Sequence, residues 1–422
     1  MRYVPAVVAL LLVVACTKTE HIATPVAPMV VRTDSAGIEI VQITQLDSTA
    51  LERWTVGPEP ITVVGDDERG DAHVFTFVKG QVRMPDGRLL IALGDEIREF
   101  DSTGTFIRNI ARKGRGPGEF NDLSAMQRIH GDTLVAYERY PATATLFSPS
   151  GQYIRRSSVI RPRADEEVPG TSFKAIFPDG TLLLAQRPPG EHLSKLGVVW
   201  SDSARPLRVD ITGKVIASFP KHWDHDATRV EARAGTVPVG QERFLGSMPA
   251  QPRRSDWGVV ATQMYYVNLE RFEIALWSGE GKLRRIVRMT TRDIPRTPAD
   301  SEIFHFKGAT YDNATVSPKM MPPVRSVESD RDGNFWITLD QRALDGGAPA
   351  VLVVDSTGNP IARSSWSLNA RSASKFRLLR NNRDISAQAV TSLAIDADER
   401  IHVLVFPLRK TAAPRSAKLG AP

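Results

Sequence analysis

A short pattern of a turn followed by a strand recurs along the chain and limits its fold more than any other feature. Each copy has Asp or Gly in the turn and then a run rich in Val, Ile or Leu. Asp and Gly tolerate the positive φ angles of tight hairpins, and such aliphatic runs are typical of buried strands. The turns are Pro85-Asp86-Gly87, His130-Gly131-Asp132, Pro178-Asp179-Gly180, Asp256-Trp257-Gly258, Asp332-Gly333 and residues 396–399.

A second kind of turn, four residues long with Gly last, follows most of these hairpins. It occurs at residues 101–104, 148–151, 210–213, 278–281 and 355–358, each time before another strand. One repeat therefore predicts two hairpins, or four antiparallel strands. Four strands per repeat, at a period of about 45 residues or more, are typical of a β-propeller blade. We expect an all-β fold with six such blades.

The two ends of the chain complete this pattern. The hairpin near residue 396 has no second turn after it, whereas Asp34-Ser35-Ala36-Gly37 and the strand after it repeat the second signal at the N-terminus. We therefore expect N-terminal strands to complete the last blade, which removes the open sheet edges that favour aggregation. Residues 38–43 and residues 61–65 are alternative candidates for the outermost closing strand.

A glycine-rich segment lies where the outer strand of one predicted blade crosses to the next. Its residues are Gly114, Arg115, Gly116, Pro117, Gly118, Glu119 and Phe120. Glycine and proline permit a compact crossing, and we expect Phe120 to fill the gap between blades. The segment resembles the Gly-x-Gly-Pro-Gly-Glu-Phe linker of NHL-type and related six-bladed bacterial propellers. Residues 34–38, with Trp54 and Pro60, resemble the start of lipoprotein propellers of the same kind.

The N-terminus resembles a bacterial lipoprotein signal. Arg2 precedes a short apolar run that ends in Val13-Val14-Ala15-Cys16, and Cys16 is the only cysteine. The resemblance implies cleavage before Cys16 and acylation of that residue, which anchors the protein to a membrane. An ordinary secretory signal, with Cys16 as a bystander, is the alternative. Thr17 and Lys18 follow the cysteine where an inner-membrane retention signal has Asp, which favours the outer membrane.

These features divide the chain into four parts. We expect a signal peptide at residues 1–15, a flexible tether at 16–33, the propeller at 34–409 and a disordered tail at 410–422. The formal net charge of +6 comes from Lys and Arg spread along the chain rather than from a basic block. We therefore expect no nucleic-acid partner.

Few residues indicate catalysis or metal binding. The segment 221–226 contains two His and two Asp, among them His222, Asp224 and His225, all of which are able to ligate a metal. His222 and His225 stand only three residues apart in an apparent loop, and no clear third partner for them is identifiable. We therefore favour a polar loop between blades over a metal site. Trp223 in the same segment is a weak candidate for ligand contact. No serine nucleophile elbow is present, and we expect neither a cofactor nor enzymatic activity.

Insertions interrupt the repeat at residues 220–252, 291–322 and 368–389. In repeat folds such insertions usually emerge as loops on one face, often the binding face. We therefore expect a membrane-anchored envelope lipoprotein whose propeller binds a protein, peptide or glycan as a non-catalytic scaffold. The alternative is a propeller hydrolase or lyase with a metal-dependent site in the central channel.

Overall fold

The structure is a computed structural model that describes residues 29–65, 67–139, 142–158, 171–186, 199–231, 244–298, 300, 320–366, 376–379 and 383–412. Within these ranges nearly all regular structure is β-strand, with a few short 3-10 turns. The all-β fold class predicted from the repeat is therefore confirmed.

Two units of four antiparallel strands follow the N-terminal segment, and within each unit every strand pairs with the next in sequence. The first unit contains β5 (Gly80–Arg83), β6 (Leu89–Ala92), β7 (Ile97–Phe100) and β8 (Phe106–Lys113). The second contains β10 (Leu123–Arg128), β11 (Leu134–Glu138), β12 (Thr143–Phe147) and β13 (Tyr153–Ser158). Between the units, β9 (Glu119–Phe120) lies parallel to β8.

Three further units continue this pairing. The third contains β14 (Thr171–Ile176), β15 (Leu182–Gln186), β16 (Val199–Val209) and β17 (Val215–Ser218). The fourth contains β19 (Phe244–Val260), β20 (Gln263–Asn268), β21 (Glu273–Trp277) and β22 (Leu283–Met289). The fifth contains β25 (Val324–Ser329), β26 (Phe335–Leu339), β27 (Val351–Val354) and β28 (Pro360–Ser364).

The final unit combines both ends of the described chain. β29 (Arg377–Leu378) and β30 (Asp384–Ile385) both pair with β31 (Ala389–Ile395), which pairs with β32 (Ile401–Thr411). On its other side β32 pairs with two N-terminal strands, β3 (Glu52–Val56) and β4 (Thr62–Val64). Of the two closing strands considered from the sequence, the later one therefore lies beside β32.

The first N-terminal hairpin lies elsewhere, and its predicted position in the last unit is wrong. β1 (Val30–Ser35) and β2 (Ile38–Ile43) form the expected hairpin, but β2 pairs in parallel with β22 of the fourth unit. Val41 and Ile43 are fully buried there, in a cluster that contains Val287. Burial of these side chains selects the neighbour, whereas the turn residues specify only the hairpin. β1 also begins at Val30, inside the predicted tether.

The predicted turn at Asp256-Trp257-Gly258 is also wrong, because these residues belong to β19. The turn comes later, at residues 261–262, between the paired residues Val260 and Gln263, and Ala261 there has a φ of +47°. Gly258 lies under the ring of Tyr265, where an added Cβ would be 3.0 Å from the hydroxyl. The segment is extended and pairs with β20 through the Asp256–Val267 and Gly258–Tyr265 pairs.

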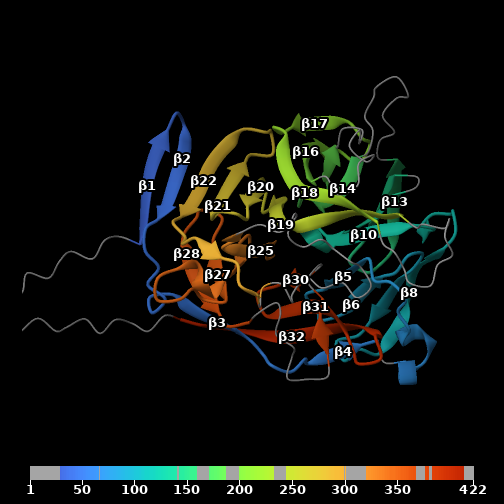
Figure 1. The fold of residues 1–422 in the computed structure, drawn as a ribbon. Helices are drawn as coiled ribbons and strands as arrows, with labels where there is room; N and C mark the ends of the chain where they lie inside the picture. Colours follow the sequence, from blue (N-terminus) through green and yellow to red (C-terminus); the bar gives the residue numbers. More distant parts are fainter. Residues whose placement is uncertain are drawn as a thin grey trace, which may run out of the picture.

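Much of the core lies between neighbouring units. Phe120, Leu123 and Phe147 pack with Val82 and Leu90, which joins the first unit to the second. Another cluster joins β2 and the fourth unit to the fifth. Figure 1 shows β5, β25 and β30 near the middle of the molecule and β1, β8 and β13 at its periphery. Because the apolar side chains fill the gaps between units, the inner strands are free to enclose a polar cavity.

Candidate functional site

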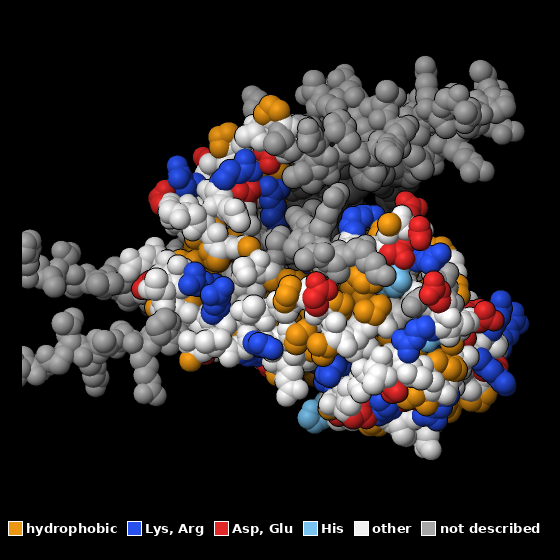
Figure 2. Space-filling view, turned by 90° about the horizontal axis from the view of Figure 1, so that it is seen from below, with side chains coloured by type: hydrophobic (Ala, Val, Ile, Leu, Met, Phe, Trp, Pro, Cys, Tyr) orange, Lys and Arg blue, Asp and Glu red, His pale blue; other side chains and the backbone are white. Residues whose placement is uncertain are grey.

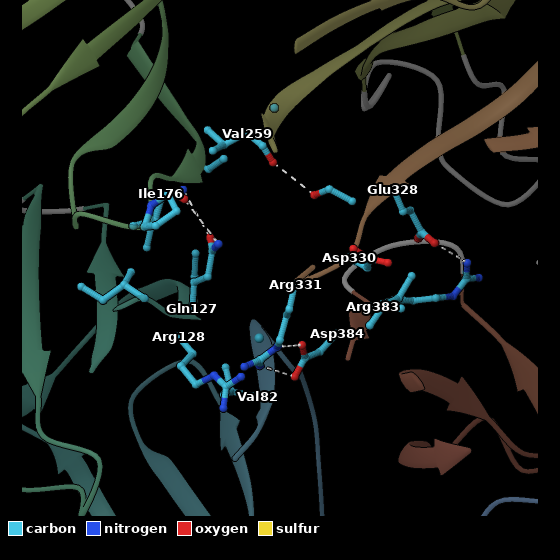
Figure 3. A pocket seen from close by; sticks show the side chains of 18 of the residues that line it. Val82, Gln127, Arg128, Ile176, Val259, Glu328, Asp330, Arg331, Arg383 and Asp384 are labelled. Atoms are coloured by element: carbon cyan, nitrogen blue, oxygen red, sulfur yellow. Dashed lines mark hydrogen bonds and ion pairs between the residues drawn. The ribbon is translucent and has the colours of Figure 1, made fainter. Parts of the chain in front are cut away.

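A cavity of about 670 Å³ lies where the first strands of the units face one another (Figure 3). Residues of β5, β10, β14, β19, β25 and β30 contribute to its wall. Its volume is within the range of roughly 300–1,000 Å³ that is usual for small-ligand sites. Five Lys or Arg residues and five Asp or Glu residues line it. The wall is therefore polar and formally balanced in charge.

An ion pair joins the fifth unit to the last one at this wall. Arg331 donates from Nε and Nη2 to the two carboxylate oxygens of Asp384, at 2.5 and 2.6 Å. The same carboxylate accepts the backbone N–H of Arg83, in the first unit, at 2.8 Å. Asp384 therefore connects three units and fixes the geometry of this side of the cavity.

A second ion pair lies nearby. The guanidinium of Arg383 donates to Glu328 at 2.9 Å (Figure 3). It also lies 4.8 Å from the ring centre of Trp366. Burial raises the pKa of Glu328, and the charge of Arg383 only partly opposes this. The carboxyl group of Glu328 is therefore easier to protonate than an exposed glutamate.

Asp256 is a second carboxyl group of the cavity with a raised pKa. It accepts the backbone N–H of Trp257 at 2.8 Å and also that of Val327 in β25. Burial raises the pKa of Asp256 to about 6, although these N–H groups and the charge of Lys174 oppose the shift. The protonation of Asp256 therefore changes near neutral pH.

Neighbouring groups belong to the same electrostatic cluster. Burial, and then the charges of Asp256 and Glu328, raise the pKa of Tyr265 well above its usual value. Lys174 extends from β14, with its ammonium 4.6 Å from the ring centre of Trp257. Such a contact is a cation–π interaction. Asp256 thus has a cation, a phenol and a second carboxyl group around it, each from a different strand.

The opposite wall comes from the second and third units. Arg128 lies 3.0 Å from Asp132 across the β10–β11 hairpin. The side chain of Gln127 bonds to the backbone N–H and C=O of Ile176 in β14, at 3.3 and 3.4 Å (Figure 3). Polar side chains of this wall are therefore held by their own neighbours before any ligand arrives.

His222, the member of the predicted metal candidate whose side chain the structure describes, is not among the residues that line this cavity. His222 begins strand β18 (His222–Glu231), so the prediction of a loop is wrong. Its ring stacks on Tyr266 at 4.4 Å and meets Trp277 edge-on at 4.8 Å. Burial lowers the pKa of His222 to about 4, which keeps the ring neutral. The side chains of Asp224 and His225 lie outside the described residues.

Trp223, the candidate for ligand contact, is half-buried in the same strand. Its backbone carbonyl accepts bonds from the hydroxyls of Ser255 and Tyr266, at 2.7 and 3.1 Å. The strand forms because β18 is paired on both sides, with β16 and with β19. The structure therefore places Trp223 in a sheet that connects the third and fourth units.

The glycine-rich segment makes the crossing between the first and second units. Glu119 accepts the N–H of Gly116 at 2.9 Å and the Nε–H of Arg112 at 2.9 Å. Gly114 has φ +153°, and an added Cβ would lie 2.0 Å from Glu119 Oε2. Phe120 is fully buried, 6.0 Å from the ring centre of Phe147. Pro117 and Gly118 complete the turn before Glu119.

Within the described ranges, no three His, Cys, Asp or Glu side chains are grouped so that they could hold a metal ion. Cys16 and the predicted signal peptide lie outside these ranges, as do residues 413–422 of the predicted tail. Sequence reasoning missed Asp256, Glu328 and Asp384. The signal that could have found Asp256 is the aliphatic pair Val259-Val260, which begins three residues after it and belongs to the same strand.

The comparisons with known proteins give structural similarities only. No protein-family model matches the sequence, and no curated protein matches it. Solved structures similar to this chain include a protein from Bacteroides fragilis described as exported, at 12% identity and a TM-score of 0.43, over 88% of this chain and 99% of that one.

Two further solved structures have comparable similarity. A protein from Bacteroides vulgatus has 9% identity and a TM-score of 0.46, over 86% of this chain and all of that one. A gluconolactonase from Xanthomonas campestris has 12% identity and a TM-score of 0.36, over 80% of this chain and 87% of that one. At these identities and TM-scores the similarities assign neither a fold family nor a function to this chain.

Two further observations concern the surface charges and the absence of a membrane-spanning helix among the described residues. Lys and Arg side chains are interspersed with Asp and Glu on the face shown in Figure 2. In the part of the chain that the structure describes, no helix is both long and apolar enough to cross a bilayer.

Proposed function

We propose that this protein is a lipid-anchored lipoprotein of the cell envelope whose six-bladed, NHL-like β-propeller binds part of a protein, a peptide or a glycan in its cavity. Three observations support the propeller. The units have four antiparallel strands, their first strands border one cavity, and β4 completes the unit of β32. In a propeller the inner strand of each blade borders the central channel.

The observation that carries the binding proposal is the preformed polar wall. Two ion pairs form this wall, Arg331 with Asp384 and Arg383 with Glu328, and in each pair the two side chains fix one another's position. Donors and acceptors fixed in advance lose little conformational entropy when a ligand binds. Since the wall groups come from separate units, the cavity offers a ligand partners on several sides.

A propeller hydrolase or lyase is the second candidate. It is favoured by one observation, namely that Asp256 and Glu328 both have raised pKa values in the same cavity. Carboxyl groups of this kind act as proton donors and acceptors in many enzymes. A metal-dependent form of this enzyme would hold its ion in the central cavity. Turnover of a bound ligand, followed by mass spectrometry, separates this candidate from binding alone.

Membrane attachment through Cys16 is the second part of the proposal. The outer membrane is favoured over the inner one, and no nucleic-acid partner is proposed, since the charges of the described surface are mixed (Figure 2). We expect Cys16→Ser to move the protein from the membrane fraction to the soluble envelope fraction. Retention of the variant in membranes would contradict the anchor.

A thermal-shift screen tests the binding function. The full mature protein is mixed with neutral oligosaccharides, charged oligosaccharides and short peptides. A ligand that binds only the folded state raises Tm in a concentration-dependent way. We expect at least one class to raise Tm, with a shift that grows with the logarithm of the ligand concentration. No shift from any class would contradict the binding proposal.

A further inference from the structure

Three of the five cationic side chains that line the cavity are paired with three of its five carboxylates. Arg331 pairs with Asp384, Arg383 with Glu328, and Arg128 with Asp132. A charged ligand would leave one of these partners uncompensated or add an unmatched charge to the wall. An uncharged polar ligand can bond to the outward lone pairs and N–H groups of such pairs without breaking them.

Asp256 supplies a rigid acceptor at this wall. The backbone N–H groups of Trp257 and Val327 donate hydrogen bonds to the carboxylate of Asp256. The ammonium of Lys174, which lies over the Trp257 ring, also interacts with this carboxylate. Gly258 leaves room for the buried ring of Tyr265. A fixed carboxylate of this kind suits hydroxyl donors, because hydrogen bonds to an ionised acceptor are short and strong.

On this basis we propose that the Asp256 side of the cavity recognises an uncharged ligand rich in hydroxyl groups, namely a neutral oligosaccharide. The inference rests on the proposed binding function and specifies its ligand class. A cavity of about 670 Å³ is too small for a folded domain but accommodates a few sugar rings. Hydroxyl groups both donate and accept, so one ring can bond to paired carboxylate and guanidinium groups together.

Binding is then linked to protonation. The charged and titratable groups facing Asp256 are Lys174 from β14, Tyr265 from β20 and Glu328 from β25. Glu328 is paired with Arg383, but its charge still contributes to the raised pKa of Asp256. The pKa of Asp256 is about 6 in the free protein. Hydroxyl donors favour the ionised carboxylate, so the affinity is expected to fall as pH falls through that value.

Isothermal titration at pH 7.5 and pH 5 tests the proposal with neutral oligosaccharides, charged oligosaccharides and peptides as separate probes. We expect a neutral oligosaccharide to bind roughly tenfold more weakly at pH 5. Asp256→Asn is expected to weaken binding by a similar factor at pH 7.5 and to remove the pH dependence. Asp345→Asn, at a side chain that is 91% exposed, is the matched control and is expected to leave the affinity and its pH dependence unchanged.

A second variant keeps the test decisive if Asp256→Asn folds poorly. Lys174→Gln removes the cation that lowers the pKa of Asp256, so the pH midpoint of binding is expected to rise. Binding of peptides or charged sugars in place of neutral ones would overturn the ligand class but leave the cavity function standing. Absence of binding by every probe would overturn both proposals.

Discussion

The carboxylate of Asp384 and the guanidinium of Arg331 form a two-point ion pair, with N–O distances of 2.5 and 2.6 Å. The pair joins β30 to the turn after β25, and Asp384 also accepts the N–H of Arg83 in the first unit. Its side chain is 11% exposed. One buried carboxylate thus connects the last unit to both of its neighbours.

We expect Asp384→Ala to lower the free energy of unfolding by about 3 kcal/mol, because it leaves Arg331 and the N–H of Arg83 without their acceptor in a mostly buried place. Urea denaturation measures the change. The control is Asp345→Ala, which removes an exposed pair with Arg292 at 3.0 Å and is expected to cost less than about 1 kcal/mol. Equal losses for the two variants would contradict the bridging role.

The N-terminal strand β3 is expected to hold the ends of the chain together through Trp54. Its ring is 5.4 Å from that of Trp336, and the ammonium of Lys410 lies 4.0 Å from its centre. Trp54→Ala is predicted to cost about 3–5 kcal/mol and to speed amide exchange in residues 408–411 of β32. Ile61→Ala, at a side chain that is 60% exposed, is the control. Unchanged exchange in β32 would refute this role.

The crossing between the first and second units depends on Gly114. A Cβ at this position would overlap Glu119 and disturb its bonds to Gly116 and Arg112. We predict that Gly114→Ala lowers stability by about 2–3 kcal/mol in thermal or urea unfolding. Gly94→Ala is the matched control, since no atom lies within 4 Å of its added Cβ. Similar losses at both positions would contradict the account of the linker.

Asp256 gives a pH dependence of stability with a definite sign. Its pKa rises from 3.8 in the unfolded chain to about 6 in the folded one. Well below pH 4 the carboxyl group of Asp256 is protonated in both the folded and the unfolded state, so it does not change the free energy of unfolding. Between pH 4 and pH 6 the unfolded state ionises first, and the folded state loses stability relative to it.

Asp256→Asn removes this ionisation. The Tm of the variant minus that of the wild type is therefore predicted to increase from pH 4 to pH 7 and then to level off, whatever its value at pH 4. Differential scanning calorimetry at several pH values measures the difference. For the control, Asp345→Asn, we expect a flat difference over the same range. A flat difference for Asp256→Asn as well would refute the raised pKa.

The sequence predicts the hairpins well because their information is local. Gly87, Gly180 and Gly333 have φ between 85° and 92° at turns predicted from Asp-Gly. Asp101 accepts the N–H groups of Thr103 and Thr105, as an Asp at the start of such a turn does. These contacts span only a few residues, so a single sequence is sufficient to predict them.

The position of the β1–β2 hairpin and the members of the cavity wall were not predictable in the same way. The parallel pairing of β2 with β22 depends on Val41 and Ile43 packing against residues almost 250 positions away along the chain. The turn at Ala261 requires a positive φ that alanine rarely adopts. Residue types alone therefore favour a turn at Asp256-Trp257-Gly258 and do not place Asp256 in the cavity wall. Only the assembled sheets bring Asp256, Glu328 and Lys174 together.

The most direct test of ligand binding in the cavity compares two substitutions of the same kind in one calorimetric titration. Gln127 lines the cavity, whereas Gln152 lies exposed in the β12–β13 turn. With the ligand that raises Tm most in the screen, Gln127→Trp is predicted to weaken binding by occupying part of the cavity. Gln152→Trp is predicted to leave the affinity within about twofold of the wild type. Wild-type affinity in a folded Gln127→Trp protein would contradict binding in the cavity.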